Sequence, residues 1–363
     1  MGSAVELVAR ACAAGLDLES LHPRVFAALR RRVPFEAVFW AVADPASLLF
    51  TRSFAQEIPP QAQQLFAENE FMGDDVNKFM HLAATSATTL FRATDGDLER
   101  SERFTEIIRP LGWGDELRVG FRDPSGVWGF MCLHRAGTDG PFSDDEIAFV
   151  DAAAPHVAKA IRRSVLLGAA IAEGTIPDAP GLVLFSSELD LIGTNGPGEE
   201  WLDLLAGPRL SGGVPNEVLV LAAAARGVPS SEFAHVPRIR VQTATGEWAV
   251  LHASVMKVGS DEQVAVVIEP ATPTELAPLI VAAYGLTPQE RRIVELVCHG
   301  ASTRVISEEL FITANTVQDH LKSIFAKTGT GSRRELVASL LTRDYMPRAA
   351  ALDPLDRKGQ FTS

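Results

Sequence analysis

The sequence predicts a multidomain α+β protein in which two sheet-and-helix blocks precede an all-helical block. The chain has 363 residues, more than one hydrophobic core of ordinary size needs. Alternating apolar runs joined by turn sequences fill its first two thirds, and the pattern then changes to apolar residues at helical spacing. We therefore expect a first block at residues 1–172, a second block at 180–272, a helical block at 280–345 and a flexible tail at 346–363.

The first block contains two predicted hairpins and several predicted helices. "EAVFWAVA" and "LLFTRSFA" flank the turn sequence "DPAS", and "ELRVGFR" and "VWGFMCLHRA" flank "DPSG". Helical patterns surround "HPRVFAALRRR" and "RSERFTEIIRPLG". The pattern indicates an antiparallel sheet covered by helices.

A long helix closes the first block. Ser143 and Glu146 form a capping-box pair at its start. Pro155 predicts a kink or two abutting helices. The apolar stripe either packs on its own sheet or pairs with a second copy in a dimer, and it comprises Ile147, Val150, Ala154, Val157, Ile161 and Val165.

The second block reads as two strands, two short helices and a three-strand meander. The strands lie in "GLVLFSSELDLIGTN" and in "RIRVQTATGEWAVLHASVMKVGSDEQVAVVIEP", and the helices lie in "GPGEEWLDLLAG" and "NEVLVLAAAARG". We find no tandem sequence repeat.

The helical block shows four capped helices. The caps are Thr287, Ser302, Thr313 and Ser332, and Gly329 ends the third helix. In the third helix the spacing predicts that Val317, Leu321, Ile324 and Phe325 point inward. The apolar residues of the other three helices are Ile293, Leu296, Val297, Val305, Ile306, Leu310, Leu336 and Val337. The last helix also carries Leu340 and Leu341, more apolar surface than one short helix needs, and is a second candidate for dimerisation.

Two short helices joined by about three residues form a helix-turn-helix, whose second helix enters the DNA major groove. The outer side of that helix carries Asn315, Gln318, Asp319 and Lys322. Gln pairs with adenine, Asp accepts from the cytosine amino group, and Lys donates to guanine. The residues expected to meet phosphates are Arg304, Lys327, Arg333 and Arg334.

Charge and composition limit the function classes. The formal charge of -13 argues against a chain that coats nucleic acid or anionic membrane along its length. Residues 286–345 carry eight Lys/Arg against seven Asp/Glu, so we expect DNA binding by a homodimer with strong salt dependence. We find neither a basic, apolar leader nor an apolar run of about 18 residues, and we expect a cytoplasmic protein without membrane contact.

"LTPQERRIVELVCHGASTRVISEELFITANTVQDHLKSIFAKTGTGSRRELV" resembles the LuxR/NarL-type helix-turn-helix. The matching features include Leu286-Thr287, Gly300, Thr316-Val317 and Gly329. The resemblance implies that the positions of Gln318, Asp319 and Lys322 face the groove and that His320 lies near the DNA backbone. Lys is common in the family at the position of Gln318, so this departure bears on the target sequence more than on DNA binding itself.

The front blocks resemble sensor domains. "FSDDEIAFVDAAAPHVAKAI" is similar to the last helix of a GAF domain, and "GLVLFSSELDLIGTNGPGEEWL" with "GEWAVLHAS" is similar to a PAS-like domain. The order of blocks resembles actinobacterial-type sensor-regulators of the LuxR class, which implies sensing of a small molecule or partner protein. No Walker loop, GxSxG, HExxH or GxGxxG motif appears in a suitable context, so we predict no enzyme activity.

Two side-chain groups of the first block are candidate sites. Aromatic residues cluster there, Phe39 among them, and they are candidates for the lining of an apolar pocket, with core packing as the alternative. Those we single out as ligand-pocket residues are Trp40, Trp113, Phe121, Trp128 and Phe130. Cys132 and His134 lie on one face of a predicted strand and are a candidate haem, metal or redox pair. The sequence shows no third ligand, and a structural role for both residues is the alternative. The three cysteines are isolated, which favours neither disulfides nor a zinc site, and we predict no cofactor. An interaction scaffold with a degenerate helix-turn-helix is the rival hypothesis for the whole chain.

Overall fold

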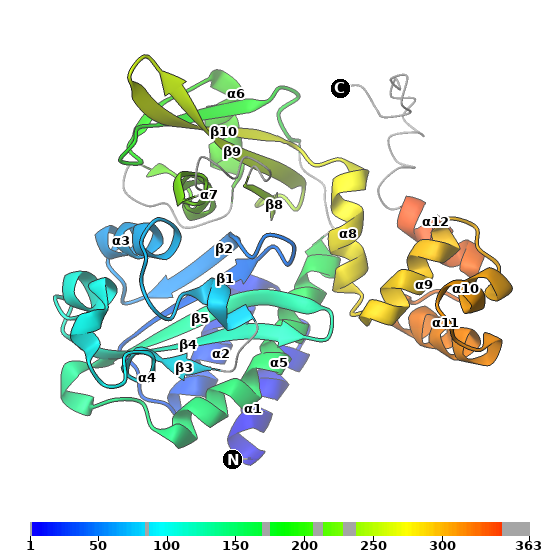
Figure 1. Cartoon of the computed structure of the whole chain (residues 1–363), viewed down its shortest axis with the longest axis horizontal. Helices are drawn as coiled ribbons and strands as arrows, with labels where there is room; N and C mark the ends of the chain where they lie inside the picture. Colours follow the sequence, from blue (N-terminus) through cyan, green and yellow to red (C-terminus); the bar gives the residue numbers. More distant parts are fainter. Residues whose placement is uncertain (1, 84–86, 169–174, 206–212, 228–236, 343–363) are drawn as a thin grey trace. The chain divides into compact units, whose positions relative to one another are not determined.

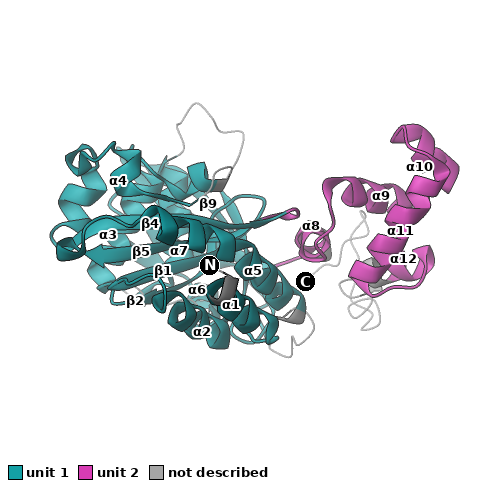
Figure 2. Ribbon diagram, turned by 90° about the horizontal axis from the view of Figure 1, so that it is seen from below, with its two compact units in different colours: residues 1–123, 127–270 teal, residues 124–126, 271–363 magenta. Residues whose placement is uncertain are grey.

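The structure is a computed structural model that describes residues 2–83, 87–168, 175–205, 213–227 and 237–342. The backbone divides into two compact units, shown in teal and magenta in Figure 2. Unit 1 comprises residues 1–123 and 127–270, and unit 2 comprises residues 124–126 and 271–363. The predicted tail, residues 346–363, lies outside the described residues.

The first block of unit 1 is built on a five-stranded antiparallel sheet in the order β2-β1-β5-β4-β3 (Figure 1). Both predicted hairpins are confirmed. Its strands are β1 Ala37–Ala43, β2 Phe50–Gln56, β3 Thr88–Thr89, β4 Trp113–Asp123 and β5 Gly126–Ala136.

Three helices pack together beside this sheet, with the last of them against β4: α1 Gly2–Ala13, α2 Leu18–Arg30 and α5 Asp144–Gly168. The predicted capping box of α5 is confirmed, since the Ser143 N–H donates to the Glu146 carboxylate at 2.8 Å. The helix continues through Pro155 as one element, so the alternative of two abutting helices is wrong. All six residues of its apolar stripe are buried within this chain, which favours packing on the block's own sheet over pairing with a second copy.

Short helices lie along the rest of the first block: α3 Pro60–Phe71, η1 Phe79–Ala83, α4 Leu90–Ala93, η2 Leu98–Arg100 and the π-helical turn η3 Phe104–Ile108. Phe50 of β2 and Phe130 of β5 pack against Phe79 of η1, and Ala67 of α3 belongs to the same core cluster. Both faces of the sheet are therefore covered.

The second block has a sheet of its own, again five-stranded and antiparallel, in the order β7-β6-β10-β9-β8. The predicted strands and helices are confirmed: β6 Gly181–Phe185, β7 Leu191–Thr194, α6 Gly196–Leu204, α7 Asn216–Gly227, β8 Arg238–Gln242, β9 Trp248–Val258 and β10 Asp261–Pro270. Numbered within each block, the two sheets have the same strand order, although the sequence shows no repeat.

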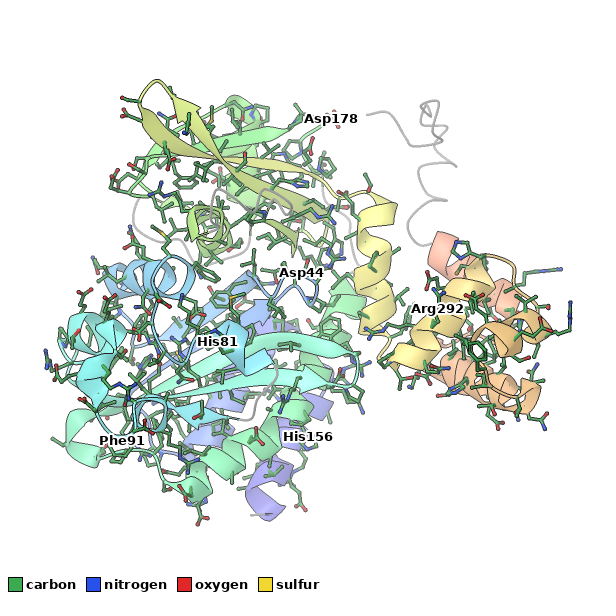
Figure 3. All side chains as sticks on the ribbon, in the orientation of Figure 1. Asp44, His81, Phe91, His156, Asp178 and Arg292 are labelled. Carbon is green, nitrogen blue, oxygen red and sulfur yellow. The ribbon has the colours of Figure 1, made fainter. Side chains whose placement is uncertain are left out.

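The two front blocks make direct contact inside unit 1. Helix α7 packs against α3 and β2. Asp44, labelled in Figure 3, follows β1 and accepts hydrogen bonds from Arg240 of β8, with Nε 2.7 Å from Oδ2 and Nη2 2.5 Å from Oδ1. Asn216 Nδ2 donates to Ser53 Oγ at 2.7 Å. Since Asp44 and Arg240 are both buried, this junction is a packed interface.

Unit 2 is helical: α8 Pro273–Ala283, α9 Pro288–Cys298, α10 Thr303–Glu309, α11 Ala314–Thr328 and α12 Arg333–Thr342. The four predicted caps are confirmed. Helix α8 was missed, although the Thr272–Glu275 capping box that starts it was visible in the sequence. Val305 is 39% exposed because α10 is short and buries mainly Ile306. The side chains of Leu340 and Leu341 lie outside the described residues.

Phe311, in the turn between α10 and α11, has a left-handed backbone with φ of 53° and a side chain that is 95% exposed. A residue with a Cβ is disfavoured there, and this ring buries almost no surface in return. We expect Phe311→Gly to raise the free energy of unfolding of unit 2 by about 0.5–1 kcal/mol, measured by thermal denaturation. Ala326→Gly, at an exposed position of α11, is the matched control and is expected to lower the free energy of unfolding by about 1 kcal/mol.

Candidate nucleic-acid interface and ligand cavity

The outer face of α11 carries a row of exposed polar side chains, Asn315, Gln318, Asp319 and Lys322. They are three or four residues apart, so they share one side of the helix. Val317, Leu321 and Ile324 are buried on the opposite side, which fixes the rotation of the helix in unit 2. The remaining predicted positions on this helix, Thr316 and His320, are half-buried at the borders of the row.

Two of the predicted DNA-contacting residues meet on the first helix of the motif. Gln318 Nε2 donates to Thr303 Oγ1 at 3.2 Å, and Arg333 Nη2 donates to the same oxygen at 2.8 Å. Arg333 Nη1 also donates to the Ala301 carbonyl at 2.9 Å. Arg333 thus links α12 to the start of α10. Thr303 was missed by sequence reasoning, because a hydroxyl at N1 of a helix carries no distinctive signal.

The surface cations of this face have acidic neighbours. Lys322 Nζ lies 3.5 Å from Asp319 Oδ1, and Arg304 Nη1 lies 3.0 Å from Glu308 Oε1. All four side chains are at least 60% exposed, so these pairs contribute little stability and separate easily. Because both ion pairs are weak, a polyanion can replace Asp319 as the partner of Lys322 and Glu308 as the partner of Arg304.

Lys327 lies in a different setting. Its Nζ donates to Glu290 Oε2 at 2.6 Å, and Ser323 Oγ donates to Glu290 Oε1 at 2.6 Å. Glu290 also accepts from the Thr287 N–H in the capping box of α9. Although burial alone raises it, the hydrogen bonds from Lys327 and Ser323 lower the pKa of Glu290 to about 2. This network joins α9 to α11 and orients the row on α11.

The stability of unit 2 should therefore depend on pH through Glu290. Its pKa is lower in the folded state, so its contribution is fully present above the ordinary value of 4.5 and is lost as the pH falls toward 2. We expect Glu290→Gln to lower the free energy of unfolding by about 2–3 kcal/mol at pH 7 and by much less at pH 2.5. Urea denaturation at both pH values measures this difference. Glu295→Gln, an exposed partner of Arg292, should show neither effect.

A small cavity of about 30 Å³ lies inside unit 1. Its floor is Phe39, Phe50, Arg118 and Cys132 of the first sheet, and one wall is α3 with Phe66 and Glu70. The other residues around it are Ile58, Gln63, Ala67, Phe79, Asn216 and Val220. The last two belong to α7, so the second block closes a cavity of the first. Arg118 is neutralised by Glu70 at 2.6 Å and lies over the Phe79 ring at 4.1 Å.

None of the five predicted aromatic candidates is among the residues that line this cavity. Trp40 packs on Phe121 with ring centroids 5.2 Å apart, and also on Phe26 of α2. Phe130 lies 5.2 Å from Phe79 and packs in one core cluster with the cavity-lining Phe50, but it does not itself line the cavity. Trp128 is fully buried, and Trp113 stacks on His134 at 4.4 Å. Of the aromatic residues singled out in the sequence, it is Phe39 that faces the cavity.

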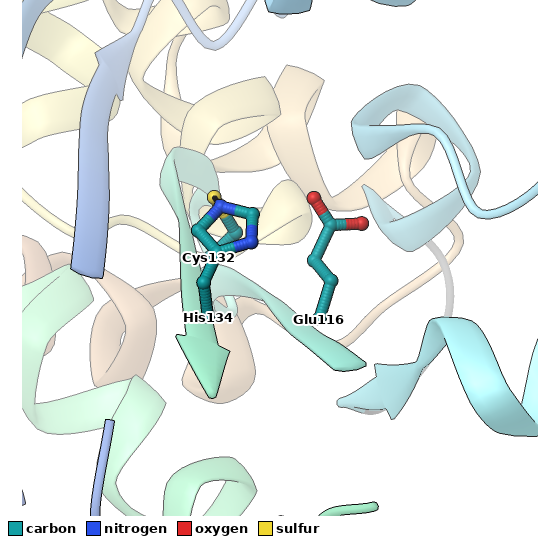
Figure 4. Close-up of side chains that lie close together, drawn as sticks. All are labelled: Glu116, Cys132 and His134. Atoms are coloured by element: carbon teal, nitrogen blue, oxygen red, sulfur yellow. Dashed lines mark hydrogen bonds between the residues drawn. The ribbon is translucent and has the colours of Figure 1, made fainter. Parts of the chain in front are cut away.

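Cys132 and His134 share a face of β5 as predicted, and Cys132 Sγ lies 3.4 Å from His134 Nε2. Glu116 of β4 lies beside them (Figure 4). Burial lowers the pKa of His134 to about 4 and raises that of Cys132. Although burial alone raises it, the charges of Arg103 and Arg118 lower the pKa of Glu116 to about 2.

Two parts of the chain match families of known proteins. Residues 285–340 match the family described as "Bacterial regulatory proteins, luxR family", and residues 17–161 match the GAF domain. The "Spore germination protein GerE" of Bacillus subtilis is 38% identical over 56 residues, which are 15% of this chain and 76% of that protein. The chain therefore belongs to the luxR family of bacterial regulatory proteins, and it carries a GAF domain in its N-terminal half.

Two further similarities are more limited. The "Monoamine regulon transcriptional regulator" of Klebsiella aerogenes is 47% identical over 64 residues, which are 18% of this chain and 26% of that protein. The chain thus spans about a quarter of that relative's length. A solved GAF domain/HD domain protein from Geobacter sulfurreducens aligns with a TM-score of 0.32 at 18% identity, over 43% of this chain and 98% of that one. Among the described residues, no helix combines the length and apolar composition required to traverse a bilayer.

Proposed function

We propose that this chain is a transcription regulator that binds double-stranded DNA through α11 and responds to a small molecule in its GAF domain. The exposed row Asn315, Gln318, Asp319 and Lys322 carries the proposal, because it offers amide, carboxylate and ammonium groups on one side of a helix held from behind. These groups match base edges in the major groove. Arg304 and Arg334, both exposed, supply phosphate contacts beside it.

The GAF cavity is the proposed ligand site. A volume of about 30 Å³ holds about two water molecules, so a larger ligand must displace a wall. Helix α7 is the wall that belongs to another block. We propose that ligand binding moves Asn216 and Val220 and so carries the signal into the second block. The mostly apolar lining, which includes four phenylalanine rings, favours an apolar ligand with one polar group for Glu70 and Arg118.

Several finer features belong to the same proposal. The second block is a PAS-like domain, with domain limits at 1–172, 180–272 and 280–345. The chain acts as a cytoplasmic homodimer without enzyme activity. The proposed dimer is supported by the low net charge of the helical block. One block with eight cationic and seven anionic side chains binds DNA weakly, whereas two joined blocks bind two half-sites together.

Binding to DNA from the protein's own upstream region, measured at several salt concentrations, tests the proposal. We expect Lys322→Ala to weaken a site-specific complex by about 1–3 kcal/mol if it contacts a base, or to reduce the salt slope by about 1 if it contacts phosphate. Lys159→Ala, an exposed lysine on α5, is the control and should leave binding unchanged.

Other outcomes separate the alternatives. Binding by residues 286–345 alone, without binding by the full chain, means that the front blocks hold the helical block off DNA until a signal arrives. If neither the full chain nor residues 286–345 bind DNA, the interaction scaffold is favoured. This second candidate function rests on Gln318, which carries no charge, and on Asp319. The Asp319 carboxylate lies 3.5 Å from Lys322 and would repel a DNA phosphate.

A further inference from the structure

Glu116, Cys132 and His134 bring a carboxylate, a thiol and an imidazole together in the core of the GAF domain (Figure 4). Their potential ligand atoms all lie within 4.8 Å of one another, and all three residues are buried. The strand pairing of β4 and β5 creates this group, and the ring stacks of His134 on Trp113 at 4.4 Å and on Phe66 at 5.3 Å fix the imidazole. Glu116 is the possible third ligand that the sequence pattern did not show.

Two buried atoms of this group lack a hydrogen-bond partner. Oε2 of Glu116 accepts from Arg103 Nη2 at 2.9 Å and lies 2.9 Å from Arg118 Nε, whereas Oε1 has no partner. His134 Nδ1 also has none, but it is Nε2 that lies 3.4 Å from Cys132 Sγ and would share an ion with it. Buried carboxylate oxygens are nearly always satisfied, so an unpartnered one beside an imidazole and a thiol indicates an ion or water between them.

The charges around the group favour a cation. Three buried carboxylates, those of Glu70, Asp75 and Glu116, surround the guanidinium groups of Arg103 and Arg118. This ion-paired cluster has one excess negative charge. A divalent ion together with a Cys132 thiolate cancels that excess, because the ion adds two positive charges and the thiolate adds one negative charge.

We propose that Glu116, Cys132 and His134 bind one divalent transition-metal ion of zinc-like character in the GAF core. Thiolate and imidazole ligands on a tetrahedral Zn²⁺ lie about 3.5 Å apart, close to the 3.4 Å between Cys132 Sγ and His134 Nε2. The mixed S, N and O donor set suits Zn²⁺ or Co²⁺ better than Mg²⁺ or Ca²⁺. On binding, a metal–sulfur bond forms and the thiol proton leaves to solvent.

The three protein ligands leave a fourth tetrahedral position for water or a small molecule. Cys132 also lines the cavity described above, so the ion lies next to that cavity. The rival explanation is a hydrogen bond from the Cys132 thiol to His134 Nε2, with a water molecule between His134 Nδ1 and Glu116.

Titration of the chelator-treated full chain with Co²⁺ tests the site. We expect one equivalent to bind and to produce a near-ultraviolet sulfur-to-cobalt charge-transfer band, which Zn²⁺ then removes by displacement. Cys132→Ser should abolish the band and weaken binding by at least about 100-fold, more than loss of an outer-shell partner usually does. Cys298→Ser, which removes an exposed thiol, is the matched control and should retain both.

A second readout on the unchanged chain guards against misfolding of the serine variant. Bound metal should slow alkylation of Cys132, located by peptide mass spectrometry, at least tenfold while leaving Cys298 unaffected. Less than 0.1 equivalent of bound Co²⁺, or a charge-transfer band that survives in Cys132→Ser, overturns the proposal and leaves the hydrogen-bonded pair with water. Neither readout involves DNA, so failure here and failure of the regulator proposal are distinguishable.

Discussion

Replacing Arg103 with methionine is expected to lower the free energy of unfolding of unit 1 by about 3–5 kcal/mol. Its guanidinium is fully buried and donates to Glu116, to Asn69 Oδ1 at 2.9 Å and to the Val76 carbonyl at 3.1 Å. Methionine fills much of the volume but donates no hydrogen bond. It leaves Glu116 with one cation in place of two and leaves the other two acceptors unsatisfied in the core.

Urea denaturation followed by tryptophan fluorescence measures this loss. Arg109→Met is the matched control, since Arg109 also pairs with a glutamate, Glu99, but both side chains are more than half exposed. An exposed pair of this kind contributes about 0–1 kcal/mol. Equal effects of the two substitutions would show that the buried network adds nothing beyond a surface ion pair.

Asp44→Ala is expected to separate the two front blocks. The carboxylate accepts from the Arg240 backbone N–H and from two guanidinium nitrogens, and its loss removes these three hydrogen bonds from a buried arginine. We expect a cost of about 3–5 kcal/mol at the contact between the blocks. The second block should then become accessible to limited proteolysis at protease levels that spare the parent, and unfolding should show two transitions.

Glu262→Ala is the control for Asp44→Ala, because it also removes a carboxylate that pairs with an arginine. Glu262 pairs with Arg226 at 3.0 Å within the second block and is 44% exposed. Its removal should leave a single unfolding transition. If Asp44→Ala also unfolds in one step with an unchanged midpoint, the contact between the blocks does not depend on this ion pair.

The helical block was predictable because its information is local. Caps such as Thr287 and Thr313 act on the residue three positions later, and inward positions repeat every three or four residues along one helix. The roles of Lys327 and Arg333 were harder to predict. Whether a cation contacts DNA or a carboxylate 37 residues earlier, as Lys327 does with Glu290, depends on packing between helices.

The cavity lining was poorly predictable for a different reason. Nearly every residue of β1 is buried, since helices cover both faces of the sheet, and the strand shows no apolar–polar alternation. Phe39 and Trp40 point to opposite faces, and only the packing of α3 and α7 decides which face encloses the cavity. Glu116 was hidden similarly, because strand pairing brings it to Cys132.

The strand order shared by both sheets has a consequence for how the chain folds. In each sheet the first strand of the block lies beside the last, so that Ala37 pairs with His134 and Gly181 pairs with Ile268. Closing such long loops costs conformational entropy before any contact forms, and sheets of this kind nucleate slowly. During synthesis the central pair of the first sheet must wait for β5 to leave the ribosome. Until then the hairpin β1–β2 has one hydrogen-bonding edge open, and an open edge of this kind favours aggregation of the nascent chain.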